Sequence, residues 1–414
     1  MPNTAPRAPV RPTGSDGAPT SRRSAAILLV LLGTLTAAAP LSLDMYLPGL
    51  PDMTADLSAR PAQVQLSLTT CLIGMALGQF LTGPLSDRWG RRRPVIVGTI
   101  AYAVLSLLCA FAPSAEALAA LRLGQGFAGG MGVVVSRAIV RDLYAGAAAA
   151  RYFSRLILVF GLAPIAAPSL GSLVLRFTSW RGVFVTLAII GMLLAALAAM
   201  RLPETLPAHR RTTGGLGNIL RSMRLLLADR VFVGYTLTQG LAFAALFAYI
   251  SGSSFVFQDV FGISATAFGL VFGGNALGMV ALGQLNGALL SRRSPRTLLI
   301  FSLAGGLAAA VALLGGALAG SLAAVTVALF YFVASLGMAQ PSGVALALDQ
   351  HPERAGTAAA VMGAAQSVIG ALAAPVVGLG DPRSAVPMAV VVLGALALAL
   401  VAALTLARPR RVAR

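Results

Sequence analysis

The chain has 414 residues, of which 57% are hydrophobic and only 11% are charged, and its formal net charge is +18. A soluble domain carries about 25% charged residues, so the composition excludes an ordinary soluble protein. The basic residues lie in short clusters between apolar blocks rather than in one phosphate-binding patch, which argues against a nucleic-acid partner.

The residue types also exclude several kinds of chemistry. All 31 basic residues are Arg, so the chain has no lysine for a Walker A loop, a Schiff base or a pyridoxal phosphate site. Cys71 and Cys109 lie in apolar blocks, where they pack well, and His209 and His351 lie in polar segments. We therefore expect no metal and no cofactor. Neither a G-x-S-x-G nor an H-E-x-x-H motif occurs, and we expect that the protein is not an enzyme.

The first 24 residues are rich in Pro, Ser, Thr, Gly and Arg, which predicts a disordered tail at 1–24. Apolar blocks of roughly 20 residues follow, the length that a helix needs to cross ~30 Å of hydrocarbon. The first block is not read as a cleaved secretory signal, because it continues past the small residues and eleven more blocks follow it. We predict an all-α membrane protein with twelve transmembrane helices, near 25–46, 63–85, 94–112, 117–140, 152–175, 182–200, 231–256, 265–290, 297–317, 321–347, 355–379 and 385–407.

The longest polar connection, 201–230, contains a Gly-Gly pair and six arginines and separates six predicted spans from six. The polar loop that begins at Gly83 after the second span is echoed from Gly287 after the eighth, at an offset of 204 residues. Two related halves suit alternating access to a site between them. We expect an N-terminal half at 25–200, a cytoplasmic linker at 201–230, a C-terminal half at 231–407 and a cytoplasmic tail at 408–414.

The arginines predict the orientation in the membrane. On one predicted side, the two tails and alternate connections hold 25 of the 31 arginines. The other side has four, Arg60, Arg176, Arg181 and Arg383, and two lie within a span. Because an excess of Lys and Arg marks the cytoplasmic side, we expect a multi-pass protein of the cell membrane with both termini in the cytoplasm.

Residues 78–94 read Gly-Gln-Phe-Leu-Thr-Gly-Pro-Leu-Ser-Asp-Arg-Trp-Gly-Arg-Arg-Arg-Pro. This stretch is similar to the signature loop between helices 2 and 3 of the major facilitator superfamily. The resemblance implies that Asp87, with Arg88 and Arg91 beside it, helps to latch a cytoplasmic gate against the start of helix 11 near Gly356. A carboxylate at a helix N-terminus gains ~0.3–1 kcal/mol. The alternative is an ordinary basic loop that only sets the topology.

A second stretch, Leu121 to Gly130 and on to Asp142, resembles helix 4 of the family, in which an embedded arginine takes part in proton coupling. Arg122 would fill that role, with Gln125 one turn away on the same face. Glycines at 126, 129, 130 and 132 would let another helix approach closely. The resemblance assigns Arg141 and Asp142 to the gate. The alternative for Arg122 is a side chain that reaches out to the membrane interface.

Residues 43–51 read Leu-Asp-Met-Tyr-Leu-Pro-Gly-Leu-Pro, which is typical of the bicyclomycin-resistance branch of drug–proton antiporters. The resemblance points to Asp44 as a proton carrier. An apolar cavity strengthens the hold of a carboxyl group on its proton, whereas a nearby arginine weakens it. Moving between these surroundings would load and release a proton. The alternative is a helix-end cap, because Pro48 and Pro51 are expected to end the helix.

Residues 161–172 resemble the motif that separates antiporters from symporters in the superfamily. The motif residues here are Gly161, Pro164, Pro168 and Gly171. The sequence departs from the general form, with Ala167 before the second proline and Ser after Gly171, which leaves the direction of transport open. A helix that is merely kinked by its prolines is the alternative.

Residues 246–255 and 275–279 also look like the bicyclomycin-resistance branch. Embedded polar and aromatic side chains could line an apolar pocket with a few polar contacts, the usual design of a small-molecule site. The predicted substrate-binding residues are Tyr46, Gln125, Gln239, Phe243, Phe247, Asn275, Gln340 and Gln366.

The predicted function is proton-coupled efflux of small, amphipathic, drug-like molecules by alternating access in the major facilitator fold. The partners would be a small-molecule substrate, protons and the lipid bilayer, and relatives imply a monomer. One alternative is a transporter of the same fold that moves a metabolite, such as a sugar, amino acid or siderophore, by symport or export. A membrane-embedded lipid enzyme and a purely structural subunit are further alternatives, and either would show no transport after reconstitution.

Overall fold

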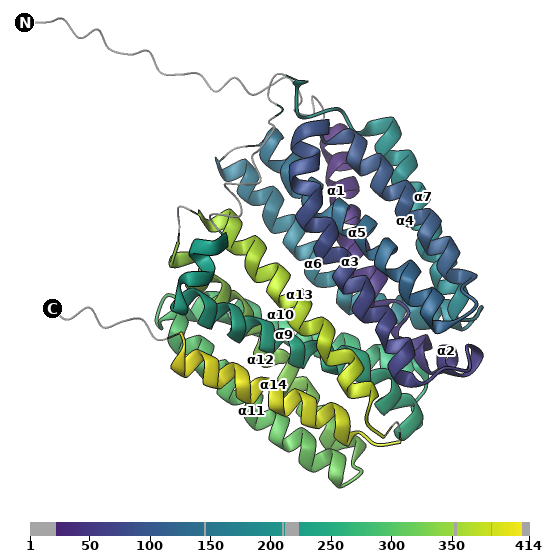
Figure 1. Cartoon of the computed structure of the whole chain (residues 1–414), viewed down its shortest axis with the longest axis vertical. Coiled ribbons are helices and arrows are strands. Elements are labelled where there is room, and N and C mark those ends of the chain that lie inside the picture. Colours follow the sequence, from purple (N-terminus) through teal and green to yellow (C-terminus); the bar gives the residue numbers. More distant parts are fainter. Residues whose placement is uncertain are drawn as a thin grey trace, which may run out of the picture.

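The structure is a computed structural model that describes residues 22–144, 146–208, 211, 223–351, 354–381 and 383–407. These residues form a bundle of long helices, and none of them lies in a strand (Figure 1). Most of the predicted tail at 1–24, all of the tail at 408–414 and the middle of the predicted linker lie outside the described residues.

The first group of helices runs from Arg22 to Arg201 and has six long members. A 3-10 turn and a short helix follow the first of them. In chain order the elements are α1 (Arg22–Asp44), η1 (Leu47–Gly49), α2 (Leu50–Asp56), α3 (Pro61–Trp89), α4 (Arg92–Ala110), α5 (Ala115–Leu143), α6 (Gly146–Leu175) and α7 (Trp180–Arg201).

The second group also has six long helices, and a π-helical turn extends the first of them. The elements are α9 (Arg230–Phe255), η3 (Val256–Val260), α10 (Ala265–Leu289), α11 (Pro295–Leu318), α12 (Leu322–Asp349), α13 (Ala355–Gly378) and α14 (Val386–Thr405). The same partners recur in both groups: α1 packs on α6, α3 on α5 and α4 on α7, as α9 packs on α13, α10 on α12 and α11 on α14.

Eleven of these helices are long and apolar enough to cross a membrane. The twelfth, α6, has 30 residues, and Leu162–Leu175 is its described apolar stretch. Hydrocarbon offers no hydrogen-bond partners to backbone N–H and C=O groups, and an α-helix pairs these groups within itself. The chain is therefore a multi-pass membrane protein, and the predicted all-α fold with two six-helix halves is confirmed.

Polar turns at the helix ends explain where the helices begin and stop. Ser114, Ser264, Ser294 and Ser321 each accept a hydrogen bond from the backbone N–H three residues later. A serine at this position stabilises a helix by ~1 kcal/mol. The residue that follows α3 is Gly90, whose φ of 88° is unfavourable for residues with a Cβ.

The segment after α1 differs from the predicted one. The expected span at 25–46 was to end at two prolines, but α1 ends at Asp44, and both prolines lie in helical turns of η1 and α2. Proline is tolerated there because the first N–H groups of a helix have no acceptor within it. The η1 turn contacts α6, α9 and α10, so this segment lies between the two groups of helices.

Glycines bring α3 and α5 into close contact. A Cβ added at Gly126 would lie 2.0 Å from the carbonyl oxygen of Cys71, and one at Gly130 would lie 2.5 Å from the next turn of α3. The equivalent pair in the second group, α10 and α12, repeats this feature, since a Cβ at Gly337 would lie 1.9 Å from the carbonyl oxygen of Met279. The predicted close approach of another helix to these α5 glycines is confirmed.

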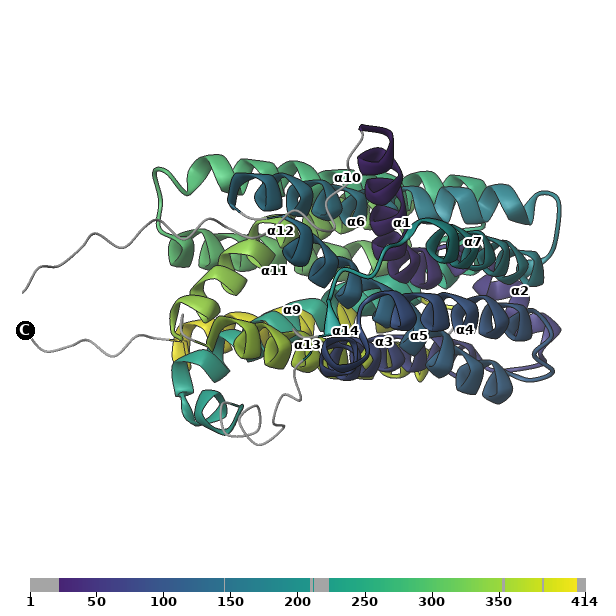
Figure 2. The ribbon, with the colours of Figure 1, turned by 90° about the horizontal axis from the view of Figure 1, so that it is seen from above.

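The two groups of helices meet mainly along two seams, α6 against α10 and α3 against α13, on opposite sides of the molecule (Figure 2). In Figure 1 the groups converge near α2 and diverge toward the end where α1 begins and α14 ends. We call the end that carries η1 and α2 the closed end, and the opposite end, where α3 and α5 finish, the open end.

Candidate transport site

A cavity of about 920 Å³ lies between the two groups of helices. Residues of α1, α3, α5 and α6 line one side, and residues of α9, α10, α12 and α13 line the other. Most of the lining is apolar, with polar side chains such as Gln79 and Ser367 set among aliphatic and aromatic ones. Such a lining is usual for a small-molecule site.

The cavity runs from the open end deep into the molecule. Its mouth includes Asp87 and Arg141 at the ends of α3 and α5 and Gly356 at the start of α13. Asp44 and Tyr249 line its inner part, toward the closed end.

Hydrogen bonds between the two groups of helices seal the closed end. The Ser254 hydroxyl donates to the carbonyl oxygen of Leu47 at 2.5 Å, and the Gln258 amide donates to that of Pro48 at 3.0 Å. Further hydrogen bonds between the groups also lie toward this end, and they come from Gln65, Thr69, Ser169 and Arg176.

Asp44 is the last residue of α1 and lies on the wall of the inner cavity. The residue is 4% exposed, and no described residue forms a salt bridge with its carboxyl group. Asp44 is therefore a buried acid that faces the cavity.

Arg122 lies on α5 and is fully buried beside the end of α1. Its Nη1 donates to Gln125 Oε1 at 2.6 Å, and its Nη2 donates to the carbonyl oxygen of Ser42 at 2.8 Å. The guanidinium also lies 4.5 Å from the centre of the Tyr46 ring, a favourable cation–π contact. The side chain points into the protein and does not reach the membrane interface, so that alternative is wrong.

Two of the predicted gate residues, Asp87 and Asp142, bond to a third, Arg91, at the start of α4. Its Nη1 lies 2.7 Å from Asp87 Oδ1, and its Nε lies 2.8 Å from Asp142 Oδ2. Burial by itself lowers the pKa of Arg91, but hydrogen bonds with Asp142 and Asp87 outweigh burial and raise this pKa above its usual value. Arg88 is exposed next to this cluster, and Arg141 lines the mouth of the cavity.

The mouth is open in this structure, and Asp87 and Gly356 both line it. The carboxylate of Asp87 is paired with Arg91 of its own loop. Its predicted contact with the start of α13 would need the two groups of helices to approach each other at the open end.

Glu204, which follows α7, was not predicted from the sequence and also belongs to this cluster. Its Oε1 accepts hydrogen bonds from the backbone N–H groups of Arg91 at 2.8 Å and of Leu206 at 3.0 Å. A carboxylate at the N-terminus of α4 interacts favourably with the helix dipole. The first residues of the predicted linker are thereby tied to the α3–α4 loop.

Four of the predicted substrate-binding residues line the cavity, namely Phe243, Phe247, Gln340 and Gln366. The two phenylalanine rings stack with their centres 6.0 Å apart and form part of the α9 wall. Apolar ligands gain from contact with such aromatic surfaces.

The other four predicted binding residues do not line the cavity. Tyr46 and Gln125 belong to the buried cluster around Arg122. The Gln239 amide donates to the carbonyl oxygen of Gln340 at 2.7 Å, and the Asn275 amide donates to the Tyr249 hydroxyl at 3.1 Å. These four side chains bond to neighbouring helices.

The four motif residues of α6 lie in different surroundings. Gly161 lies at the middle of the helix, and Pro164 lines the cavity. Pro168 packs against α10 near Gly269. A Cβ at Gly171 would lie 1.7 Å from the carbonyl oxygen of Met45, so only glycine allows α6 to approach the end of α1 this closely.

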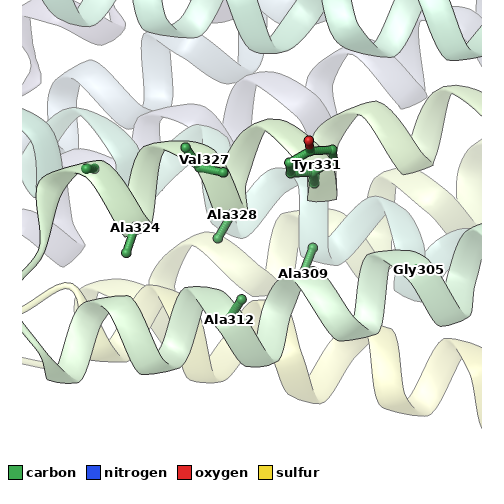
Figure 3. A pocket seen from close by; sticks show the side chains of 8 residues that line it. Gly305, Ala309, Ala312, Ala324, Val327, Ala328 and Tyr331 are labelled. Carbon is green, nitrogen blue, oxygen red and sulfur yellow. The ribbon is translucent and has the colours of Figure 1, made fainter.

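A second hollow, of about 580 Å³, lies between α11 and α12 (Figure 3). Alanines of the two helices point toward each other across it, and Tyr331 is its largest side chain. It shares no residue with the central cavity. Its apolar surface suits contact with lipid acyl chains, and it lacks the charged groups of the central cavity.

Comparison with known proteins identifies the family. Residues 32–375 match the sequence profile of the Major Facilitator Superfamily. The chain belongs to the major facilitator superfamily. An uncharacterized MFS-type transporter of Bacillus subtilis, YdgK, is 39% identical over 380 residues, which cover 89% of this chain and 94% of that protein.

Two further comparisons concern the branch and the fold. A bicyclomycin resistance protein homolog of Haemophilus influenzae is 31% identical over 368 residues, which cover 89% of this chain and 92% of that protein. A bacterial homolog of the human lysosomal transporter Spinster, in an inward-facing and unoccupied conformation, shares the fold with a TM-score of 0.75 and 17% identity, covering 93% of this chain and 98% of that one. The resemblance to the bicyclomycin-resistance branch is confirmed, and the family and fold are those of transporters.

Proposed function

We propose that this facilitator exports small, amphipathic, drug-like molecules across the cell membrane in exchange for protons. The observation that carries the proposal is Asp44, a buried carboxylate without a salt-bridge partner among the described residues, on the wall of a large and mainly apolar cavity. Ionisable groups inside a membrane are costly and usually functional. The name of the Haemophilus relative, a bicyclomycin resistance protein homolog, supports a drug-like substrate.

The proposed orientation puts the open end in the cytoplasm. The arginine-rich connections, the start of α1 and the end of α14 lie toward this end, and excess Arg marks the cytoplasmic side. The cavity would then receive substrate from the cytoplasm in the state described here. In the opposite state the hydrogen bonds at the closed end would break, and Asp87 would approach the start of α13 at the open end.

Arg122 would bias the protonation of Asp44. Its buried guanidinium bonds to Ser42, two residues before the acid, and so favours the ionised carboxylate when the two groups are near each other. Tilting of the halves would change that neighbourhood and the access of water to Asp44. One charge that crosses 100 mV yields about 2.3 kcal/mol, enough to drive about a fortyfold concentration ratio.

The test replaces Asp44 with Asn and measures proton-driven uptake of a panel of antibiotics into inside-out vesicles. We expect D44N to lose uptake that depends on the proton gradient while still binding the drug. The matched control is D52N, because Asp52 is exposed on α2 and lies away from the cavity. Full retention of coupling in D44N would remove Asp44 from the mechanism.

The direction of transport has its own test. An imposed pH gradient of either sign should drive substrate and protons in opposite directions in vesicles. Movement of both in the same direction would refute export by antiport and favour symport of a metabolite.

A further inference from the structure

The mouth of the central cavity has more positive than negative charge. Arg91 pairs with Asp87 and Asp142, and Glu204 of the same cluster pairs with Arg211. Arg137 and Arg141 line the same part of the cavity, and neither forms a salt bridge with a described residue. Of the charged residues that line the mouth, Arg91, Arg137 and Arg141 are positive and Asp87 is negative, so this lining has a net positive charge.

Arg137 lines the cavity from the membrane-spanning helix α5, one helical turn further from the end of the helix than Arg141. Val134 and Ala138 of the same α5 face line the cavity with it. Its side chain is exposed to the cavity, and it makes no hydrogen bond with any described residue. An arginine within a membrane is normally paired or functional, and a guanidinium offers five donors in a planar fork that matches an oxyanion.

The packing of α5 against α1 gives the depth of Arg137. Arg122 bonds to Ser42, and Gly132 packs against the backbone of Leu35, so the two helices run in opposite directions. Arg137 lies five residues beyond Gly132 toward the open end, and Asp44 lies nine residues beyond Leu35 toward the closed end. At 1.5 Å per residue the two are roughly 20 Å apart along the helices.

This separation lets the cavity hold an acid at one end and an anion at the other. The Debye length is about 10 Å at 0.1 M salt, so an anion at Arg137 would be largely screened from Asp44 in a solvated cavity. Between them the wall is mainly apolar and includes Met75, Phe80 and Phe247. A ligand that extends inward from Arg137 would therefore place an apolar body on this wall.

We propose that Arg137 binds an acidic group, a carboxylate or a sulfonate, on the transported molecule. The preferred substrates would be amphiphiles with an anionic end and an apolar, preferably aromatic, body. The inference rests on the proposed function for the identity of the cavity as the transport site. It requires no particular direction of transport and no role of Asp44.

The test measures equilibrium binding by titration calorimetry, using the purified full chain without a proton gradient. The probes are naphthalenesulfonate and its neutral analogue naphthalenesulfonamide, which share the same apolar body. We expect the wild-type chain to bind the sulfonate more tightly. Arg137→Gln should weaken sulfonate binding about tenfold or more and leave sulfonamide binding unchanged. Arg293→Gln, in an exposed loop outside the cavity, is the matched control and should change neither.

Several outcomes would overturn the proposal. A wild-type chain that binds neither probe, or binds both equally, has no anion site in its cavity. If R137Q still preferred the sulfonate to the sulfonamide as strongly as the wild-type chain, Arg137 would not be the anion-binding residue. Unchanged sulfonamide binding shows that R137Q is folded, and R137K, which keeps the charge but not the planar fork, should fall between the two. Because no gradient is applied, full retention of coupling in D44N would contradict the proposed role of Asp44 without affecting this result.

Discussion

The hydrogen bonds at the closed end should hold the transporter in its present conformation. Ser254 and Gln258 of the second group of helices donate to the carbonyl oxygens of Leu47 and Pro48 in the first group. In the proposed cycle, these bonds join parts of the chain that would separate when the closed end opens. The Ser254→Ala, Gln258→Ala double variant should therefore shift the equilibrium toward the state that is open at this end.

The size of the shift follows from the two bonds. Each is worth about 1 kcal/mol net, so their loss changes the free-energy difference between the two states by about 2 kcal/mol. This corresponds to roughly a thirtyfold change in the equilibrium constant. If the alternate state holds about 1% of the wild-type population, it should rise to roughly a fifth in the double variant.

Spin-label distance measurements across the open end can give the populations of the two states. Labels replace Trp89 and Gln350, which are exposed at the ends of α3 and α12, in a background without the two native cysteines. We expect a second, shorter distance in the double variant. Ser264→Ala is the control, since it removes a helix cap within one group and should not favour either state. An unchanged distance distribution in the double variant would refute the assignment of these bonds to the gate.

Three further predictions follow from the packing and the charges. Gly126→Val should lower the midpoint temperature of thermal unfolding, because overpacking against the Cys71 carbonyl costs ~1–3 kcal/mol. The control is Gly305→Val, which should lower this midpoint far less because no atom lies within 4 Å of the added Cβ. Arg91→Gln removes the cation that pairs with two carboxylates and should cost about 3 kcal/mol of folding free energy. The control, Arg293→Gln, should not have this cost. Equal unfolding midpoints for the two variants would contradict a stabilising role of Arg91. Because the pKa of Arg91 is raised by its carboxylate partners and the folded state gains from its charged form, this contribution is present at neutral pH and is lost only in strongly alkaline solution as pH rises. Fluorescent protein fused to either terminus should fluoresce and alkaline phosphatase should stay inactive, and the reverse result would contradict cytoplasmic termini.

The arrangement of the helices could be predicted well because the bilayer constrains it so strongly. Each span must be apolar over a length set by the membrane and must satisfy its own backbone. The α5 glycines also indicated a close helix contact, which the Gly126 seam with α3 confirms. Helix ends were harder to predict, since the stop at Asp44 depends on how η1 packs between the two groups of helices.

The site was predictable only in part. The loop motif indicated a cluster around Asp87, and the structure joins Asp87 and Asp142 through Arg91. Glu204 belongs to that cluster through its hydrogen bond with Arg91, which lies 113 positions away in the sequence, and no local pattern reveals such a contact. Arg137 did carry a signal, because it is an ionisable residue inside a predicted span, but the sequence did not show which way it faces.

By itself, the sequence determined that this is a helical membrane protein of the major facilitator superfamily, because hydrocarbon thickness and backbone hydrogen bonding dictate the length and composition of each span. Only the tertiary structure decided which embedded polar groups face the cavity. Gln340 and Gln366 line it, whereas Gln125 and Gln239 turn toward neighbouring helices. The physical reason is that the rotation of each helix about its axis depends on its packing against helices that are distant in the sequence. A polar residue in an apolar span does not by itself reveal that rotation.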